Sequence, residues 1–195
     1  MRFLASDETK RLLLLTGDPG VGKTTVLLRI VEALKARGYK VGGMVSREVR
    51  SRGRRIGFEI LDLAGGGSGW LAHVGQKTGP QVGRYRVNLD DLDAVGADSI
   101  VKAVENSDVV VVDEIGPMEL FSEGFKDAVK RAVDSGKLVV GVIHWKARHS
   151  LIDDVRARKD AEVFMVTYEN RENLDKAIIE RVVKFLESSC KKKAL

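Results

Sequence analysis

The chain has 195 residues, 44% of them hydrophobic and 31% charged, a composition typical of a soluble protein with one substantial core. The formal net charge is +5, but Lys191, Lys192 and Lys193 supply three of these charges, so the other residues together carry only +2. Such a small net charge predicts no dedicated nucleic-acid surface. No apolar run is long enough for a membrane span, the N-terminus lacks a signal-peptide core, and the single Cys190 cannot form an internal disulfide; we therefore expect a cytoplasmic protein.

The first elements predict a strand–helix–strand unit. Residues 10–16 form an apolar strand, and residues 23–37 carry apolar side chains at helical spacing up to the stop signal Gly38. A second strand, residues 41–46, ends at the charged pair Arg47-Glu48. Its crossover from the first strand should be right-handed.

Between the first strand and its helix lies a phosphate-binding loop that matches G-x-x-x-x-G-K-[ST], the Walker A motif. Its glycines allow tight turns and present backbone N–H groups to phosphates, and the following helix adds its dipole. Lys23 is expected to contact the β- and γ-phosphates, and the Thr24 hydroxyl to bind Mg²⁺. The nucleotide-binding residues predicted here are Gly17, Asp18, Pro19, Gly20, Val21, Gly22, Lys23, Thr24 and Thr25.

Residues 47–96 interrupt the alternation of strands and helices. We interpret them as a β-rich insertion, a hairpin or small sheet beside the nucleotide site, with strands at 54–63 and 84–89 and glycine-rich loops that could act as a lid. A second independent domain is not expected, so residues 1–195 are interpreted as a single domain. Residues 187–195 are expected to be a basic, frayed tail.

After the insertion the alternation resumes. Helices are predicted at 97–105, 122–133, 151–158 (or a turn) and 172–186, and strands at 108–114, 137–143 and 161–167. The pattern favours an α/β fold, a mostly parallel sheet covered on both faces. By analogy with motor-type ATPases, the expected strand order is 5-1-4-3-2, with strand 137–143 inserted next to the phosphate-loop strand.

The acidic pair Asp113-Glu114 ends a buried strand of four valines, the position of a Walker B motif. Asp113 is expected to hold Mg²⁺, mostly through water, together with Thr24. Glu114 is the predicted general base for an attacking water. An acidic residue that merely terminates a strand is the structural alternative.

Other candidates have weaker signals. His144 follows the inserted strand and could sense the γ-phosphate or, equally, serve a structural role. Arg47 is the first candidate for stabilising transition-state charge, with Arg84 and Arg86 behind it. Thr167, Asn170 and Arg171 follow the last strand and could contact the base, or cap the last helix.

Taken together, these segments resemble a known family. The phosphate loop, residues 57–63, 69–74 and 82–88, Val112-Asp113-Glu114-Ile115-Gly116-Pro117-Met118-Glu119-Leu120-Phe121, and residues 166–171 occur in this order. The combination is similar to the thermostable nucleoside-triphosphatases of bacteria and archaea, relatives of the human cancer-related nucleoside-triphosphatase, over residues 10–186. In place of the arginines that the family often has after the histidine, this chain has Trp145, Lys146, Ala147 and Arg148.

The resemblance implies slow, Mg²⁺-dependent hydrolysis of ATP, GTP, CTP and UTP, with loose base selection, and identifies no protein partner. It assigns the phosphate loop, Asp113 and Glu114 to this reaction. Two alternatives stay open: a nucleotide or nucleoside kinase, which shares the phosphate loop, and a regulatory nucleotide-binding switch. A phosphorylated acceptor would indicate the first, and stimulation of turnover by a partner the second.

Overall fold

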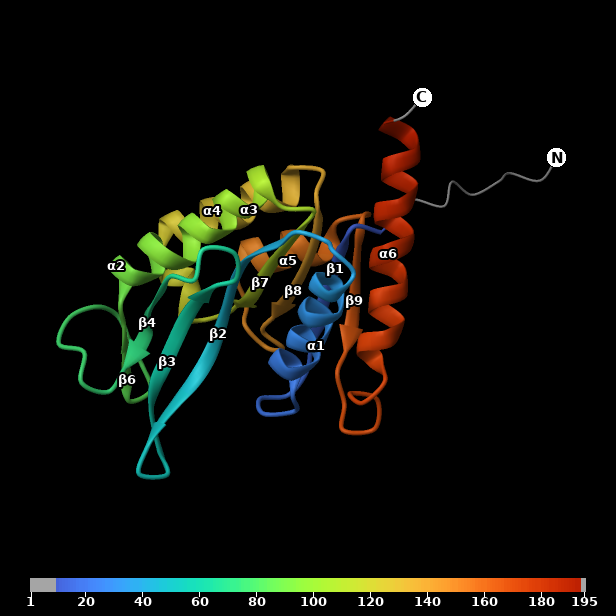
Figure 1. The fold of residues 1–195 in the computed structure, drawn as a ribbon. Helices are drawn as coiled ribbons and strands as arrows, with labels where there is room; N and C mark the ends of the chain where they lie inside the picture. The colour runs from blue at the N-terminus through green and yellow to red at the C-terminus, as the bar shows by residue number, and fades with distance from the viewer. Residues whose placement is uncertain (1–9, 194–195) are drawn as a thin grey trace.

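Nine strands form one sheet with helices on both faces in the computed structural model, which describes residues 10–193 (Figure 1). The strands are β1 (Leu12–Thr16), β2 (Val41–Ser51), β3 (Arg54–Asp62), β4 (Ser68–His73), β5 (Gln81–Val82), β6 (Tyr85–Val87), β7 (Val109–Ile115), β8 (Leu138–Ile143) and β9 (Ala161–Met165). The helices are α1 (Lys23–Ala36), α2 (Leu89–Asp91), α3 (Asp98–Asn106), α4 (Glu123–Asp134), α5 (Ser150–Ala157) and α6 (Leu174–Lys193), with a π-helical segment η1 (Leu92–Ala97) and a 3-10 turn η2 (Glu119–Phe121).

The strand order across the sheet is β5-β6-β4-β3-β2-β7-β8-β1-β9. From β2 to β9 all neighbours are parallel, and β8 lies between β1 and β7, so that Val140 has Leu13 on one side and Val111 on the other. Counted among the parallel strands alone, this is the order 5-1-4-3-2, and the α/β prediction is confirmed. The carboxyl ends of β1, β7 and β8 therefore meet at one edge of the sheet.

The insertion does not form a separate small sheet. Instead β3, β4, β6 and β5 extend the main sheet by antiparallel pairing from β2. The prediction that the second strand ends near Ser46 is also wrong, because β2 continues to Ser51 and turns back at Arg52 (φ 49°) and Gly53 (φ 74°). The outer part of this ribbon is exposed on both faces, so no hydrophobic alternation marks it as a strand.

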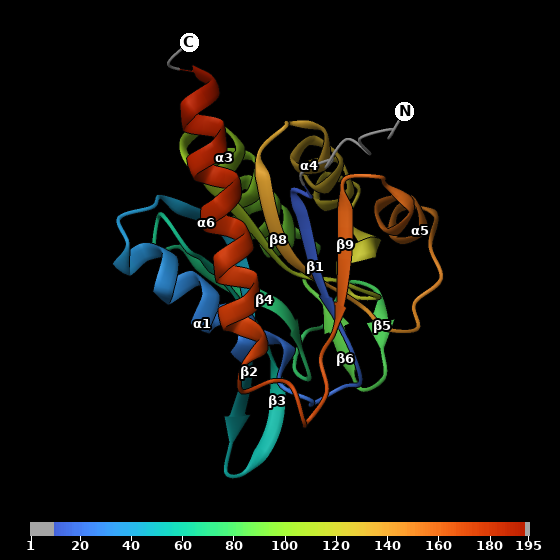
Figure 2. The same cartoon turned by 90° about the vertical axis from the view of Figure 1, so that its right-hand side faces the viewer.

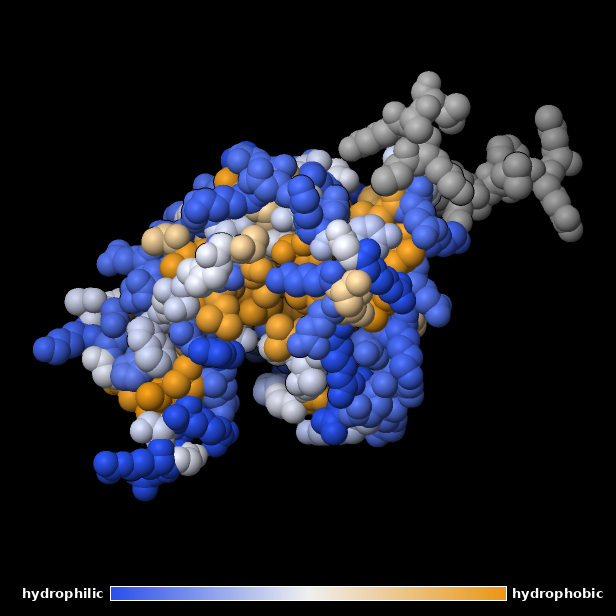
Figure 3. Space-filling view, viewed as in Figure 1, coloured by the Kyte–Doolittle hydropathy of each residue, from blue (hydrophilic) through white to orange (hydrophobic). Residues whose placement is uncertain are grey.

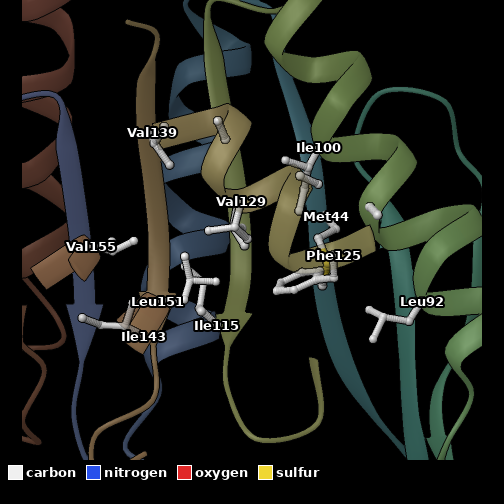
Figure 4. Packing of buried hydrophobic residues seen from close by; sticks show 14 of the residues in the cluster. Met44, Leu92, Ile100, Ile115, Phe125, Val129, Val139, Ile143, Leu151 and Val155 are labelled. Carbon is white, nitrogen blue, oxygen red and sulfur yellow. The ribbon is translucent and has the colours of Figure 1, made fainter. Parts of the chain in front are cut away.

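Alternate strand residues pack into two core layers. Leu12, Leu14 and Val112 face η1, α3, α4 and α5, where Phe125 is fully buried (Figure 4). Leu13 and Leu15 face the opposite layer, which is covered by α1 and α6 (Figure 2). Because β1, β7 and β8 bury both faces, these three strands are apolar along almost their whole length.

Two segments differ from the expected boundaries. The helical stretch expected at 97–105 begins at Leu89, because the Asn88 side chain accepts a hydrogen bond from the Asp91 N–H (3.2 Å) and starts α2. Residues 187–193, which were predicted to belong to a frayed tail, are helical, because α6 extends to Lys193. Within residues 10–193, no helix is long and apolar enough to cross a membrane.

Candidate active site

The phosphate loop joins β1 to α1 at the carboxyl edge of the sheet. Gly20 (φ 78°) and Gly22 (φ 106°) adopt left-handed conformations that favour glycine. At Gly17 (φ 149°) a Cβ atom would lie 2.6 Å from the Val166 carbonyl oxygen, so only glycine lets the loop pack against the end of β9. The helix begins directly after Gly22 with no acidic side chain in its first turn, which leaves its positive end open to an anion.

Lys23 folds back over this loop. Its Nζ donates hydrogen bonds to the carbonyl oxygens of Gly17 (3.0 Å) and Asp18 (3.3 Å), and the residue is only 9% exposed. Asp18 and Pro19 are exposed on the outside of the loop, whereas Val21 is buried beneath it. The ammonium group is therefore held over the concave backbone, where phosphate oxygens would replace the carbonyls as its partners.

Asp113 lies on β7 beside the start of α1. Burial raises the pKa of Asp113 to about 7, opposed by a hydrogen bond from Thr24 and the charge of Lys23. Its Oδ2 is buried and has no hydrogen-bond partner within the described structure. An unpaired buried carboxylate oxygen next to a hydroxyl suits a hard cation such as Mg²⁺, so Asp113 and Thr24 fit the predicted metal site.

Glu114 follows through a cis peptide bond and is half-buried. Burial raises the pKa of Glu114, while the nearby charge of Lys23 lowers it, and His144 also lies close to this carboxyl group. The structure therefore brings Lys23, Glu114 and His144 close together. In the sequence these residues lie in three separate segments.

His144 directly follows β8, where its N–H donates to the Ile115 carbonyl (3.1 Å). Its Nδ1 accepts hydrogen bonds from the backbone N–H groups of Lys146 (3.2 Å) and Ala147 (2.9 Å). The neutral ring then carries its hydrogen on Nε2. His144 therefore organises its own loop and also lies near Glu114, while its role as a γ-phosphate sensor stays a prediction.

The arginine candidates have partners elsewhere. Arg47 lies within β2 rather than at its end, 60% exposed and paired with Glu59 on β3 (2.6 Å). Arg84 donates to the Arg55 carbonyl and to the Tyr85 hydroxyl, and Arg86 donates to the Gly79 carbonyl (2.9 Å). In the part of the chain that the structure describes, none of these three side chains bonds to the phosphate loop.

The three base-contact candidates in the loop after β9 make different contacts. Thr167 and Asn170 bond to each other, the Thr167 N–H to Oδ1 (2.9 Å) and the Asn170 N–H to Oγ1 (3.3 Å), which organises the turn before α6. Arg171 instead reaches the phosphate loop, where Nη1 donates to the Val21 carbonyl (3.4 Å). A cavity of about 240 Å³ lies here, lined by Gly22, Thr25, Val26, Arg29, Arg171 and Glu172.

Sequence reasoning missed two side chains that support the site. Arg156 on α5 donates to the carbonyl of His144 (2.8 Å) and so holds the end of β8. Glu119 is buried behind Glu114: a Cβ on Gly116 would lie 3.1 Å from an oxygen of each carboxyl group. Arg156 lies on an amphipathic helix and resembles an ordinary surface residue, whereas Glu119 belongs to the segment 112–121 that carries the family resemblance but was given no role of its own.

Comparison with known proteins agrees with this geometry. The family described as NTPase matches residues 12–179. The nucleoside-triphosphatase THEP1 of Methanopyrus kandleri is 48% identical over 176 residues, covering 90% of this chain and 97% of that protein. The protein of the same name from Thermofilum pendens is 48% identical over 162 residues, covering 83% and 89%.

Two solved structures are also similar. A human cancer-related nucleoside triphosphatase superposes with a TM-score of 0.75 at 38% identity, covering 88% of this chain and 97% of that one. The crystal structure of THEP1 from Aquifex aeolicus gives the same TM-score, 0.75, at 29% identity, covering 86% and 96%. With the phosphate loop, the acidic pair and the strand order in agreement, the chain belongs to the NTPase family.

Proposed function

We propose that the protein is a Mg²⁺-dependent nucleoside-triphosphatase that hydrolyses ATP, GTP, CTP and UTP to the diphosphate and phosphate. The main support is the position of Glu114, next to the metal-site candidate Asp113 and close to both Lys23 and His144. A carboxylate at this point can take a proton from a water that attacks the γ-phosphate. We also propose a cytoplasmic location, which the single cysteine favours.

In the proposed mechanism the triphosphate lies along the phosphate loop, bound by backbone N–H groups and the start of α1. Lys23 exchanges its loop carbonyls for the β- and γ-phosphate oxygens. Asp113 and Thr24 would hold Mg²⁺, which when bound offsets the negative charge of these phosphates. Glu114 orients a water in line with the bond to the leaving diphosphate and accepts its proton.

The electrostatic balance at Glu114 suits a general base. Burial alone would favour the neutral acid, which cannot accept a proton. The charge of Lys23 acts in the opposite direction and favours the carboxylate. His144, which lies near Glu114, is proposed to be a positioning residue for it.

The cavity beside the phosphate loop supports our proposal that the enzyme selects only loosely among bases. The side chains of Arg29 and Glu172 are 37% and 58% exposed, and Arg171 stacks over the Tyr168 ring at 5.1 Å. Long, partly exposed side chains adapt to purines and pyrimidines alike, whereas strict selection requires fixed polar groups.

The test is phosphate release from the four nucleoside triphosphates with Mg²⁺, using the wild type, Glu114→Gln and the surface control Glu180→Gln. We expect similar slow release from all four, a loss of about 10²–10⁴-fold in Glu114→Gln with binding retained, and no change in the control. A loss below about tenfold would move the base to another residue. Tight binding without release would favour the kinase or the switch.

A further inference from the structure

The positive charge of this protein is concentrated in one part of the fold. Residues 47–88, here called the arginine lobe, contain eight Lys and Arg residues against three Asp and Glu, a net charge of +5 that equals that of the whole chain. With the three tail lysines set apart, the remaining residues sum to −3. The near-neutral body expected from composition is thus an average over a basic lobe and an acidic remainder.

The β2–β3 hairpin of the arginine lobe lies at the same edge of the sheet as the phosphate loop. β2 runs parallel to β7, so its outer half, from Arg47 to Ser51, extends past the edge at which Asp113 lies. The Val74 N–H donates to the Ile56 carbonyl (2.9 Å) and Arg84 to the Arg55 carbonyl, which ties the loop before β6 to the hairpin. The β2–β3 hairpin projects from the molecule (Figure 1).

The space-filling view shows a hydrophilic tip, with a hydrophobic patch above it, and a notch that separates this projecting part from the block containing α1 (Figure 3). The five hairpin arginines, Arg47, Arg50, Arg52, Arg54 and Arg55, are all exposed. Glu48 pairs with Arg50 and Arg55, and Glu59 pairs with Arg47, so two carboxylates serve three guanidinium groups.

At the tip, the side chains of Arg52 and Arg54 take part in none of the ion pairs or hydrogen bonds found among residues 10–193. Exposed guanidinium groups that lack a carboxylate partner are available to an external anion.

We propose that the β2–β3 hairpin binds the phosphate backbone of a nucleic acid. Seven of the eight basic residues are arginines, whose planar guanidinium groups bind phosphate oxygens in pairs. A projecting two-stranded ribbon has the dimensions that enter the major groove of duplex DNA.

An anionic membrane fits this surface less well. The tip sequence, residues 50–55, is Arg-Ser-Arg-Gly-Arg-Arg and contains no apolar side chain that could enter a bilayer. A phosphate backbone, in contrast, requires only exposed cations in a row.

The test measures fluorescence anisotropy of a labelled short duplex DNA and of single-stranded DNA and RNA between about 50 and 200 mM salt. The proteins are the wild type, Arg52→Ala/Arg54→Ala and the control Lys40→Ala/Lys159→Ala. The control removes two exposed cations from the opposite edge of the sheet. Neither double variant alters a residue assigned to hydrolysis, so phosphate release should remain at the wild-type rate in both.

We expect salt-dependent binding by the wild type and the control. In the hairpin variant the slope of log K against log salt should fall by about 2, and binding at ~0.1 M salt should weaken by about tenfold or more, because each phosphate contact contributes ~0.9 to the slope. A preference for the duplex over single strands would indicate groove binding, and equal binding would indicate backbone contacts on either form; both support the proposal.

Three results would overturn it: no binding by the wild type at the lowest salt, equal weakening in both double variants, or hairpin-dependent binding to phosphatidylserine vesicles without binding to nucleic acid. Because hydrolysis is measured on the same samples, a failure of the proposed enzyme activity is distinguishable from a failure of this proposal.

Discussion

The Lys23 ammonium illustrates how a single residue depends on its surroundings. Buried at the start of α1, it is satisfied by two carbonyl oxygens of its own loop rather than by a carboxylate. A carboxylate partner would compete with a nucleotide for this charge, whereas neutral carbonyls exchange readily for phosphate oxygens. The loop is thereby organised before the triphosphate arrives.

Replacement of Lys23 should therefore abolish the response to nucleotide. A non-hydrolysable triphosphate with Mg²⁺ at about 100 times its Kd should raise the unfolding free energy of the wild type by about 2.7 kcal/mol. In Lys23→Ala this gain should disappear, while the exposed Lys184→Ala on α6 should keep it. Thermal unfolding with and without nucleotide is the measurement, and an undiminished shift in Lys23→Ala would contradict the assignment.

At the scale of elements, glycines in β2 allow this strand to lie close to β7. Gly42 and Gly43 occupy β2 here, and a Cβ on Gly43 would lie 2.1 Å from the Val111 carbonyl oxygen. Gly43 also has a positive φ of 108°. The pairing that brings β2 beside the Asp113 strand therefore depends on glycine at this position.

We predict that Gly43→Ala lowers the free energy of unfolding by roughly 2–5 kcal/mol, the sum of a left-handed alanine and a backbone clash. The matched control is Gly38→Ala, which also has a positive φ (85°) but has no atom within 4 Å of the added methyl group. It should cost only about 1–2 kcal/mol. Guanidinium unfolding of both variants distinguishes the clash from the backbone strain, and equal losses would show that the strands separate to admit the methyl group.

The outer strands are the elements that the hydrophobic pattern of the sequence predicts least well. The buried strands β1, β7 and β8 are continuous apolar runs, and their existence was predicted correctly. The extension of β2 beyond Ser46 was not predicted, because its outer residues are exposed and charged. Strand pairing there is fixed by the antiparallel partner β3, which local sequence does not reveal.

At the scale of the whole molecule, buried carboxyl groups should make stability depend on pH. Burial raises the pKa of Glu119 to about 8, with further increases from the charges of Glu114 and Asp113. A carboxyl whose pKa is higher in the folded than in the unfolded state binds more protons when folded, so stability is greatest below the unfolded pKa and falls as pH rises through the folded pKa.

Without metal, the free energy of unfolding should therefore decrease from about pH 4.5 to about pH 8. In Glu119→Gln this decrease should be smaller by up to about 5 kcal/mol, since the pKa of Glu119 rises from 4.5 to about 8 and one pKa unit corresponds to about 1.4 kcal/mol; the remaining slope belongs partly to Asp113. Guanidinium unfolding in a chelator across this range is the measurement, with Glu180→Gln as control. Parallel curves for Glu119→Gln and the wild type would contradict the prediction.

Analogy with motor-type ATPases supplied the parallel strand order. The sequence by itself determined the α/β class, the phosphate loop and the acidic pair Asp113-Glu114. These features are local: a glycine-rich turn, a run of valines or a helical period reflects contacts within a few residues. Tertiary structure alone decided that the insertion joins the main sheet, that Glu114 meets Lys23 and His144, and that Arg47 pairs with Glu59. It also gathered the positive charge of the chain into one lobe, because pairing between distant strands, not spacing along the chain, sets which charges become neighbours.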